Sequence, residues 1–227
     1  MTMTKWLMAM AGAALLTAVP AQAGEAHVGL AKGDVLIRLR AIYVAPNERS
    51  GSILPALPGE RVGVDDSVMP EIDFTYMLSD LIGAELVLAT TNHSLRGRSG
   101  ATGGIGKIGS TWVLPPTLTA QYHFNPHGHV RPYVGAGINY TIFWNENASD
   151  GLETAVGPTT IHMADSFGYA FQAGLDVDIS KRVFLNFDIK YIDMQTTAYL
   201  NTTALGRQSV HVNIDPIVVG VGLGMRF

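Results

Sequence analysis

The stretch RPYVGAGINYTIFW, Arg131–Trp144, decides the fold of this chain, because its alternate residues form two different faces. The first face is apolar and carries Pro132, Val134, Ala136, Ile138, Tyr140, Ile142 and Trp144. The second face is mixed and carries Arg131, Tyr133, Gly135, Gly137, Asn139, Thr141 and Phe143. Side chains alternate across a strand, so the pattern predicts a strand with one apolar face. Aromatic residues at the end of that face are typical of a strand that crosses from hydrocarbon into water.

The length of this stretch favours one of two interpretations. Soluble strands most often have about 5–6 residues, whereas a tilted membrane strand needs about 9–11. Arg131–Trp144 is longer than both. We therefore predict a lipid-facing strand of a closed barrel. The alternative is a long strand of a soluble β-sandwich.

Four stretches resemble the outer membrane protein W (OmpW) family of Gram-negative bacteria. They are RPYVGAGINYT, LPPTLTAQYHF at 114–124, FTYMLSDLIGAELVLAT at 74–90, and the C-terminal Arg226-Phe227. The resemblance implies an all-β fold, an eight-stranded antiparallel transmembrane β-barrel with up-and-down topology. It also implies passage of small hydrophobic molecules across the outer membrane. A terminal Phe is shared by many outer-membrane barrels, so we expect Phe227 to be recognised by the barrel assembly machinery.

The N-terminal residues have the features of a secretory signal peptide. Lys5 supplies a positive charge, Leu7–Leu16 a short apolar run, and Ala21-Gln22-Ala23 a small-residue cleavage site. We expect residues 1–23 to be removed after Ala23, and residues 24–227 to form the barrel in the cell outer membrane. The apolar run is shorter than the roughly 20 residues of a membrane-spanning helix, and no later segment reaches that length.

Composition excludes several classes of function. The formal net charge is −4, which disfavours a nucleic-acid partner because such binders usually carry a basic patch. The chain contains no Cys, so a disulfide framework and a thiolate metal site are impossible. We expect no cofactor and no metal.

Eight segments alternate in the same way: 34–44, 67–78, 82–91, 111–124, 131–144, 166–179, 183–194 and a last segment that ends at 227. In the first, Arg38 and Arg40 must face inwards, because an arginine that faces lipid near the bilayer centre costs about 2–4 kcal/mol. Long loops at 45–66, 92–110, 145–165 and 195–209 alternate with short turns. Long extracellular loops and short periplasmic turns are typical of outer-membrane barrels. A change of parity near Asp215-Pro216 suggests a bulge in the last strand.

The inward residues divide by depth in a lumen that is just wide enough for side chains or one small ligand. Towards the periplasm, charges of both signs predict a charged plug: Arg38, Arg40, Glu85, Arg131, Asp176, Asp178, Asp188, Lys190 and Arg226. Towards the outside the predicted channel lining is mainly apolar: Met69, Val87, Ala89, Val113, Phe143, Phe167, Ile192 and Met194. By the resemblance, Val87 matches an apolar constriction and Phe167 an aromatic position, although the parity of Phe167 points outwards. A packed core without any path is the alternative.

A solute that enters the apolar half should leave sideways. Burial in the apolar half stabilises the solute by about 25 cal/mol per Å² of its apolar surface. Passage through a network of ion pairs would cost free energy and cancel this gain. Pro115-Pro116 is the candidate lateral opening, because neither residue has an N–H for the ladder. The resemblance also implies lateral release into outer-membrane lipids. A simple bend in the strand is the alternative.

Two further motifs are weak. Residues 104–109 satisfy GxGxxG but precede a strand, whereas dinucleotide binding needs a strand, a turn and a helix. His123, His127 and His129 flank a short turn without a carboxylate at ligand spacing. We interpret both as structural.

The sequence therefore predicts an outer-membrane channel for uptake of small hydrophobic molecules from outside, with lateral release. The alternatives are a narrow ion-conducting pore, a passive structural or adhesive barrel, and a lipid-modifying barrel enzyme. An enzyme would need a Ser or Thr nucleophile near a His and a carboxylate. Ser209, His211 and Asp215 are the only compact grouping of that kind, and their spacing is unspecific. We predict no enzymatic activity.

Overall fold

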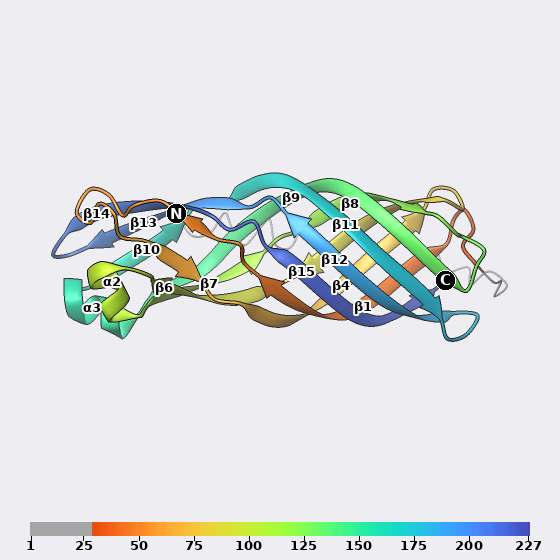
Figure 1. Cartoon of the computed structure of the whole chain (residues 1–227), viewed down its shortest axis with the longest axis horizontal. Coiled ribbons are helices and arrows are strands. Elements are labelled where there is room, and N and C mark those ends of the chain that lie inside the picture. Colours follow the sequence, from red (N-terminus) through yellow and green to blue (C-terminus); the bar gives the residue numbers. More distant parts are fainter. Residues whose placement is uncertain (1–28) are drawn as a thin grey trace.

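The computed structural model describes residues 29–227, so the predicted signal peptide at 1–23 lies outside the described residues. The described chain forms a closed, antiparallel, eight-stranded β-barrel, as the sequence predicts (Figure 1). In the order in which they pair, its strands are β1 (Val35–Ala45), β4 (Ser67–Met77), β5 (Ile82–Ala89), β8 (Thr117–His123), β9 (Val130–Ala148), β11 (Ser166–Asp178), β12 (Val183–Ile192) and β15 (Ile217–Arg226). Pairing between β1 and β15 joins the first strand to the last and closes the ring.

The outer face of the barrel is a band of exposed apolar side chains. Leu39 in the middle of β1 is 62% exposed, and its cross-strand partners Ile72 and Leu223 are also exposed. On β9, Ile138 is exposed while Tyr133 of the opposite parity is buried. A soluble sandwich would bury the apolar face of each strand against a second sheet. Here the polar parity is the buried one, so the apolar band must be covered by hydrocarbon.

The two ends of the barrel differ. Short turns join β4 to β5, β8 to β9 and β11 to β12 at one end, where the C-terminus also lies; we call this the short-turn end. The opposite end, at the left of Figure 1, carries the longer connections, and we call it the long-loop end. This alternation is the one that the sequence predicts.

The predicted long loops contain much more regular structure than expected. They contain all or part of β2 (Arg49–Ser50), β3 (Val62–Val64), β6 (Thr91–Gly97), α2 (Gly100–Ile105), β7 (Lys107–Leu114), α3 (Asp150–Val156), β10 (Thr159–Met163), β13 (Gln195–Thr202) and β14 (Gly206–Asn213). The prediction of plain loops at 92–110 and 195–209 is wrong, because both segments are hairpins that lengthen the barrel wall. Val210 and Val212 bury an apolar face inside this extension, a signal that alternation alone could have revealed.

The two helices are short, and no helix within residues 29–227 is long and apolar enough to cross a membrane. Helix α3 begins after Ser149, whose Oγ accepts a 3.1 Å hydrogen bond from the N–H of Leu152. In front of α2, Glu60 accepts hydrogen bonds from the N–H groups of Ala101 and Thr102, at 2.8 and 2.7 Å. Hydrogen bonds from Thr102 and Ala101 lower the pKa of Glu60, because they favour its ionised form.

The last strand is interrupted where the sequence suggests a bulge, but its parity does not change. Residues with even numbers face inwards on both sides of the interruption, as Val212 of β14 and Val218 of β15 show. Asp215 has a φ of 38°, and Pro216 cannot donate to a ladder. The chain is thus broken into β14 and β15, and both segments keep the same face towards the lumen.

Inward glycines make room for two large rings near the short-turn end. A Cβ on Gly174 of β11 would collide with the ring of Tyr133, and one on Gly224 of β15 with the ring of Phe184. Tyr133 and Phe184 are both almost completely buried. These rings and the polar residues around them fill the lower lumen.

Candidate functional site

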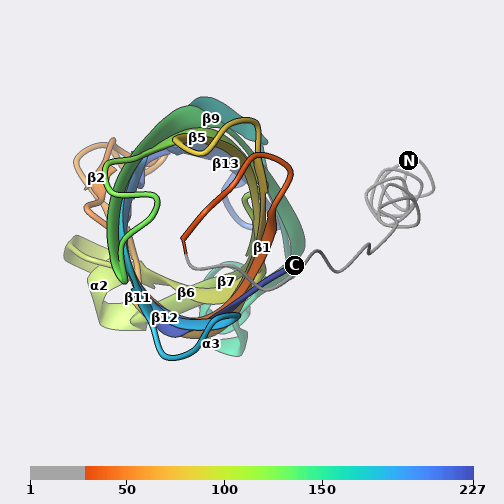
Figure 2. The same cartoon turned by 90° about the vertical axis from the view of Figure 1, so that its right-hand side faces the viewer.

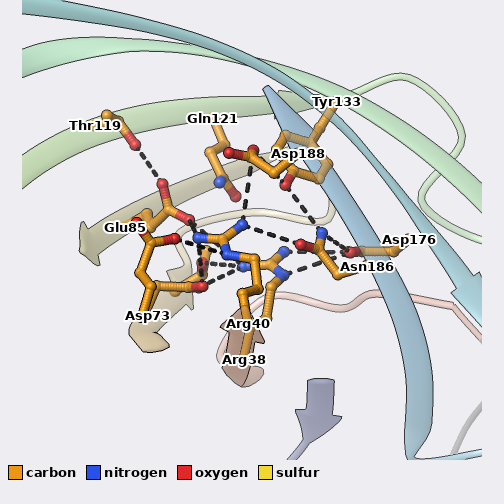
Figure 3. Close-up of polar contacts among 12 residues, drawn as sticks. Arg38, Arg40, Asp73, Glu85, Thr119, Gln121, Tyr133, Asp176, Asn186 and Asp188 are labelled. Atoms are coloured by element: carbon orange, nitrogen blue, oxygen red, sulfur yellow. Dashed lines mark hydrogen bonds and ion pairs between the residues drawn. The ribbon is translucent and has the colours of Figure 1, made fainter. Parts of the chain in front are cut away.

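Two arginines of β1 form the centre of a buried charge network that fills the middle of the barrel (Figure 3). Arg38 Nη1 lies 2.9 Å from Asp73 Oδ1, and its Nη2 lies 3.1 Å from Asp176 Oδ2. Arg40 Nη2 lies 2.6 Å from Asp73 Oδ2, and its Nε lies 2.8 Å from Glu71 Oε1. Glu71 and Asp73 occupy these places because they lie opposite Arg40 and Arg38 in the register of β1 and β4.

Lys190 of β12 completes the charge network on the side of the long-loop end. Its Nζ lies 3.0 Å from Glu71 Oε1 and 2.6 Å from Asp188 Oδ1. Asp188 Oδ2 also accepts a 2.9 Å hydrogen bond from the hydroxyl of Tyr133. Burial of an ion costs several kcal/mol unless opposite charges and hydrogen bonds compensate it. Each of these three cations has at least two carboxylates within 4.0 Å, which provides that compensation.

The predicted charged plug therefore divides into two layers. The structure brings Arg38, Arg40, Glu85, Asp176, Asp188 and Lys190 together in the charge network. The remaining three residues lie nearer the short-turn end. There Arg131 Nη1 lies 2.6 Å from Asp178 Oδ1, and Arg226 donates to the backbone oxygens of Gly29 and Lys181. The ring of Phe184 separates the layers, with the guanidinium carbons of Arg38 and Arg131 at 5.6 and 5.5 Å from its centre.

The N-terminal segment before β1 closes the short-turn end, a feature that the sequence does not predict. Figure 2 looks into the barrel from this end and shows the red segment before β1 reaching across the ring. The N–H of Leu30 donates a 2.6 Å hydrogen bond to the carbonyl of Pro126. Its side chain is completely buried in a cluster with Leu36, Met77 and Phe184. A single apolar residue ahead of the first strand has no alternating partner, so no sequence pattern marks it.

An apolar cavity lies in the lumen between the charge network and the long-loop end. Its walls include Ile42 and Val44 of β1 and Phe143 of β9, and Glu71 and Lys190 border it on the network side. The space open to the centre of a water molecule is about 40 Å³. Since about 10–15 Å³ suffices for one water, the cavity has room for a few waters or for part of a slender solute.

Six of the eight predicted lining residues border this cavity: Val87, Ala89, Val113, Phe143, Ile192 and Met194. Met69 has the same inward parity but is half-buried and does not line the cavity. The prediction for Phe167 is wrong, because its side chain is 64% exposed on the outer face of β11. Phe167 pairs with the outward Tyr140, as its parity predicts, and so does not occupy the lining position that the family resemblance implies.

The lining residues that come from the extended wall were not predicted from the sequence. Val64, Leu95, Met163, Ile214 and Pro216 border the cavity as well. Most belong to segments expected to be loops or lie at the break before β15. These side chains point into the lumen because the hairpins of the long-loop end continue the barrel wall.

Pro115-Pro116 lies at a gap in the barrel wall. On one side of it, β5 pairs with β8 as far as Val87 and Thr117. Beyond it, β6 pairs with β7 from Thr91 and Val113. Within the described chain, residues 88–90 and 114–116 register no ladder pairs with each other. The prolines stay attached to β9, where the N–H of Tyr140 donates to Pro116 O at 3.1 Å, so the gap opens only towards β5 and β6.

The weaker motifs do not assemble into sites. Residues 104–109 run from the end of α2 into β7, the reverse of the order that dinucleotide binding requires. His123 is buried, whereas the side chains of His127 and His129 are 68% and 79% exposed. Within residues 29–227, no group of three or more His, Cys, Asp or Glu side chains is arranged to hold a metal.

The grouping of Ser209, His211 and Asp215 is also not formed. His211 Nδ1 lies 3.2 Å from Thr197 Oγ1 on the outer face of the long-loop extension. Asp215 instead accepts a 3.2 Å hydrogen bond from Arg49 and another from the N–H of Met194. These hydrogen bonds hold Asp215 in place at the break between β14 and β15.

Known proteins share this fold and much of this sequence. The sequence model of the OmpW family matches residues 31–227. Outer membrane protein W of Escherichia coli K12 is 36% identical over 199 residues, covering 86% of this chain and 89% of its own. The crystal structure of the outer membrane protein OprG from Pseudomonas aeruginosa superposes with a TM-score of 0.82 at 31% identity, covering 88% of this chain and 98% of OprG.

A more distant relative carries a name that refers to metabolism. The dibenzothiophene metabolism operon protein PahQ of Pseudomonas aeruginosa is 26% identical over 174 residues, covering 75% of this chain and 77% of its own. The family match and the E. coli and OprG similarities extend over nearly the whole described barrel. This chain belongs to the OmpW family of outer-membrane β-barrels.

Proposed function

We propose that this barrel is a channel through which small hydrophobic molecules enter from outside and leave sideways into the membrane. The observation that carries the proposal is the apolar cavity beside the wall gap, because Pro115 both borders the cavity and interrupts the ladder. In outer-membrane barrels the long loops face the exterior, so the cavity lies on the side from which a solute arrives.

The closed short-turn end supports a sideways exit. A solute that continued towards the periplasm would meet Arg38, Arg40 and Lys190 with their carboxylates, and then the buried Leu30. Separating such buried ion pairs leaves uncompensated charges, at a cost of about 3–5 kcal/mol. Hydrocarbon beyond the wall gap imposes no such cost on an apolar solute. We also propose that the barrel acts without catalysis.

The name of one relative agrees with an apolar solute. PahQ is named for the metabolism of dibenzothiophene, a flat aromatic compound without charge. We propose that this chain handles molecules of the same general character. A narrow ion-conducting pore is the second candidate, and a preference for small charged solutes would favour it.

Uptake of a solute panel tests the channel. We expect liposomes that contain the chain to take up naphthalene faster than empty liposomes, with no difference for glucose. Ala89→Phe should abolish the gain, because the new ring fills the cavity that Ala89 borders. Ala136→Phe is the matched control, since Ala136 is exposed on the outer face of β9. Equal rates for wild type and Ala89→Phe would contradict the route.

The double variant Pro115→Val, Pro116→Thr tests the lateral opening. Adjacent N–H groups of a strand point to opposite sides, and Pro116 O already accepts from Tyr140 of β9, so the N–H gained at position 115 would face residues 88–90 and that gained at position 116 would face β9. We expect the ladder to close and naphthalene uptake to slow while folding is retained. Pro70→Val is the control, because Pro70 lies on the outer face of β4 within an intact register with Ala41. Unchanged uptake in the double variant would remove this exit from the proposal.

The ends of the chain give two further proposals. We propose that the mature barrel begins at Gly24, which the mass of the protein purified from outer membranes would show. We also propose that Phe227, exposed beside the short-turn end, is recognised by the assembly machinery. Deletion of Phe227 should lower the amount of barrel in the membrane without changing the uptake per molecule.

A further inference from the structure

The apolar cavity between the charge network and the long-loop end has polar side chains at its network side. Glu71 and Lys190 border it, and both side chains are almost completely buried. Facing them, the cavity is bordered by Ile42, Val44, Ala89, Phe143, Ile192 and Val218. A solute that fills this space therefore meets apolar walls along its length and a charged pair at one end.

The charged pair has hydrogen-bonding capacity to spare. An ammonium group has three N–H donors, and Lys190 directs two of them to Glu71 and Asp188, at 3.0 and 2.6 Å. Within residues 29–227, the ion pairs of Glu71 with Lys190 and Arg40 both use Oε1, which leaves Oε2 as an acceptor. One donor and one acceptor thus lie next to each other at the end of the cavity.

The net charge at this end decides which head group fits. The charge network has fewer cations than carboxylates, because Arg38, Arg40 and Lys190 are shared among Glu71, Asp73, Glu85, Asp176 and Asp188. A carboxylate would add to this excess of buried negative charge, and an ammonium group would lie beside Lys190 without an acceptor for its remaining N–H. A neutral hydroxyl accepts one hydrogen bond and donates another, and so matches both free positions.

The other polar side chains around the cavity already have partners. Thr91 and His93 bond to each other, His93 also contacts Asp65 O, Thr117 donates to Pro115 O, and Thr111 donates to Trp112 O. They therefore compete weakly for a head group. The pair of Glu71 and Lys190 remains the position where a polar atom of a solute gains most.

We propose that the cavity binds small apolar molecules that carry a single hydroxyl group, and that Glu71 and Lys190 hold this hydroxyl. The hydroxyl oxygen accepts from Lys190 Nζ, and its proton is donated to Glu71 Oε2, while the hydrocarbon part lies against the apolar walls. This inference rests on the proposed function, because it assigns the solute class to the same cavity.

Binding of matched eight-carbon ligands tests the proposal. The full mature chain in lipid nanodiscs, with labelled methyl groups of Ile42, Ile192 and Met194 as reporters, is titrated with 1-octanol, 1-methoxyoctane, octane and octanoate. Kd is expressed in free ligand concentration to correct for uptake by lipid. We expect 1-octanol to bind about ten-fold more tightly than octane or octanoate, because hydrogen bonds to charged groups are strong. The ether, which accepts but cannot donate, should bind more weakly than 1-octanol.

A paired substitution locates the effect. Glu71→Met with Lys190→Met removes one charge of each sign, and we expect the ratio of the octane Kd to the octanol Kd to fall below about two-fold. Glu48→Met with Arg98→Met is the matched control, because this pair, 2.8 Å apart with the Arg98 side chain exposed and Glu48 half-buried, does not border the cavity. The control should keep the full ratio.

The outcomes separate this inference from the proposed function. Equal binding of 1-octanol and octane to the wild type would overturn the hydroxyl site and leave the apolar channel intact. Tightest binding of octanoate would overturn it in favour of an anion site. Failure of all four ligands to bind would overturn both proposals. The comparison of the four ligands uses the unaltered chain, so the proposal is tested even if the double variant misfolds.

Discussion

Replacement of Arg38 by Met is expected to lower the free energy of unfolding by about 3–5 kcal/mol, because it leaves the buried Asp176 without its counter-charge and Asp73 with Arg40 alone. Asp73 and Asp176 are both completely buried, and Arg38 binds them at 2.9 and 3.1 Å. Lipid and side chains surround the charge network, so water cannot replace the lost guanidinium. Unfolding in guanidinium chloride, with the barrel in detergent micelles and tryptophan fluorescence as the signal, measures the loss.

Arg49→Met is the matched control for Arg38→Met. Arg49 also pairs with an aspartate, Asp215, at 3.2 Å, but the arginine side chain is 73% exposed. Exposed pairs contribute about 0–1 kcal/mol, so this variant should unfold almost like the wild type. A similar small loss for Arg38→Met would mean that the charge network does not stabilise the barrel.

Replacement of Leu39 by Arg is expected to lower the free energy of unfolding by about 2–4 kcal/mol when the barrel is in a bilayer. Leu39 is 62% exposed in the middle of β1 and lies between Ile72 and Leu223 on the outer face. On a soluble protein, a substitution at so exposed a position would change stability by only about 0.5 kcal/mol. The size of the effect therefore reports directly whether hydrocarbon covers this face. Reversible unfolding from phosphatidylcholine vesicles is the measurement.

Thr160→Arg controls for the chemistry of the new side chain. Thr160 is exposed on β10, in the wall extension at the long-loop end, where we expect water and head groups rather than hydrocarbon. Arginine should be tolerated there. Equal losses for Leu39→Arg and Thr160→Arg would contradict the placement of the bilayer around the lower barrel.

The sequence predicted the barrel because alternation is a local property. The parity of Arg131–Trp144 can be determined without knowledge of the partner strands, and the same argument forced Arg38 and Arg40 inwards. Alternation predicted the structure less well where strands are short or lie beyond the bilayer. The segments β6 and β13, with the first halves of β7 and β14, fall in the predicted loops, although they enclose an apolar core. The outer faces of β6 and β13 are largely polar, so neither shows the lipid-facing pattern.

The sequence alone thus determined which residues face lipid and which face the lumen, because the period of two applies to each strand separately. Only the tertiary structure decided which of the inward residues meet. The stagger between strands places Lys190 beside Glu71, more than a hundred residues away. It also decides that Pro115-Pro116 faces residues 88–90 across an unpaired gap. Such contacts depend on register and ring closure, which join segments distant in the chain, and no local pattern records them.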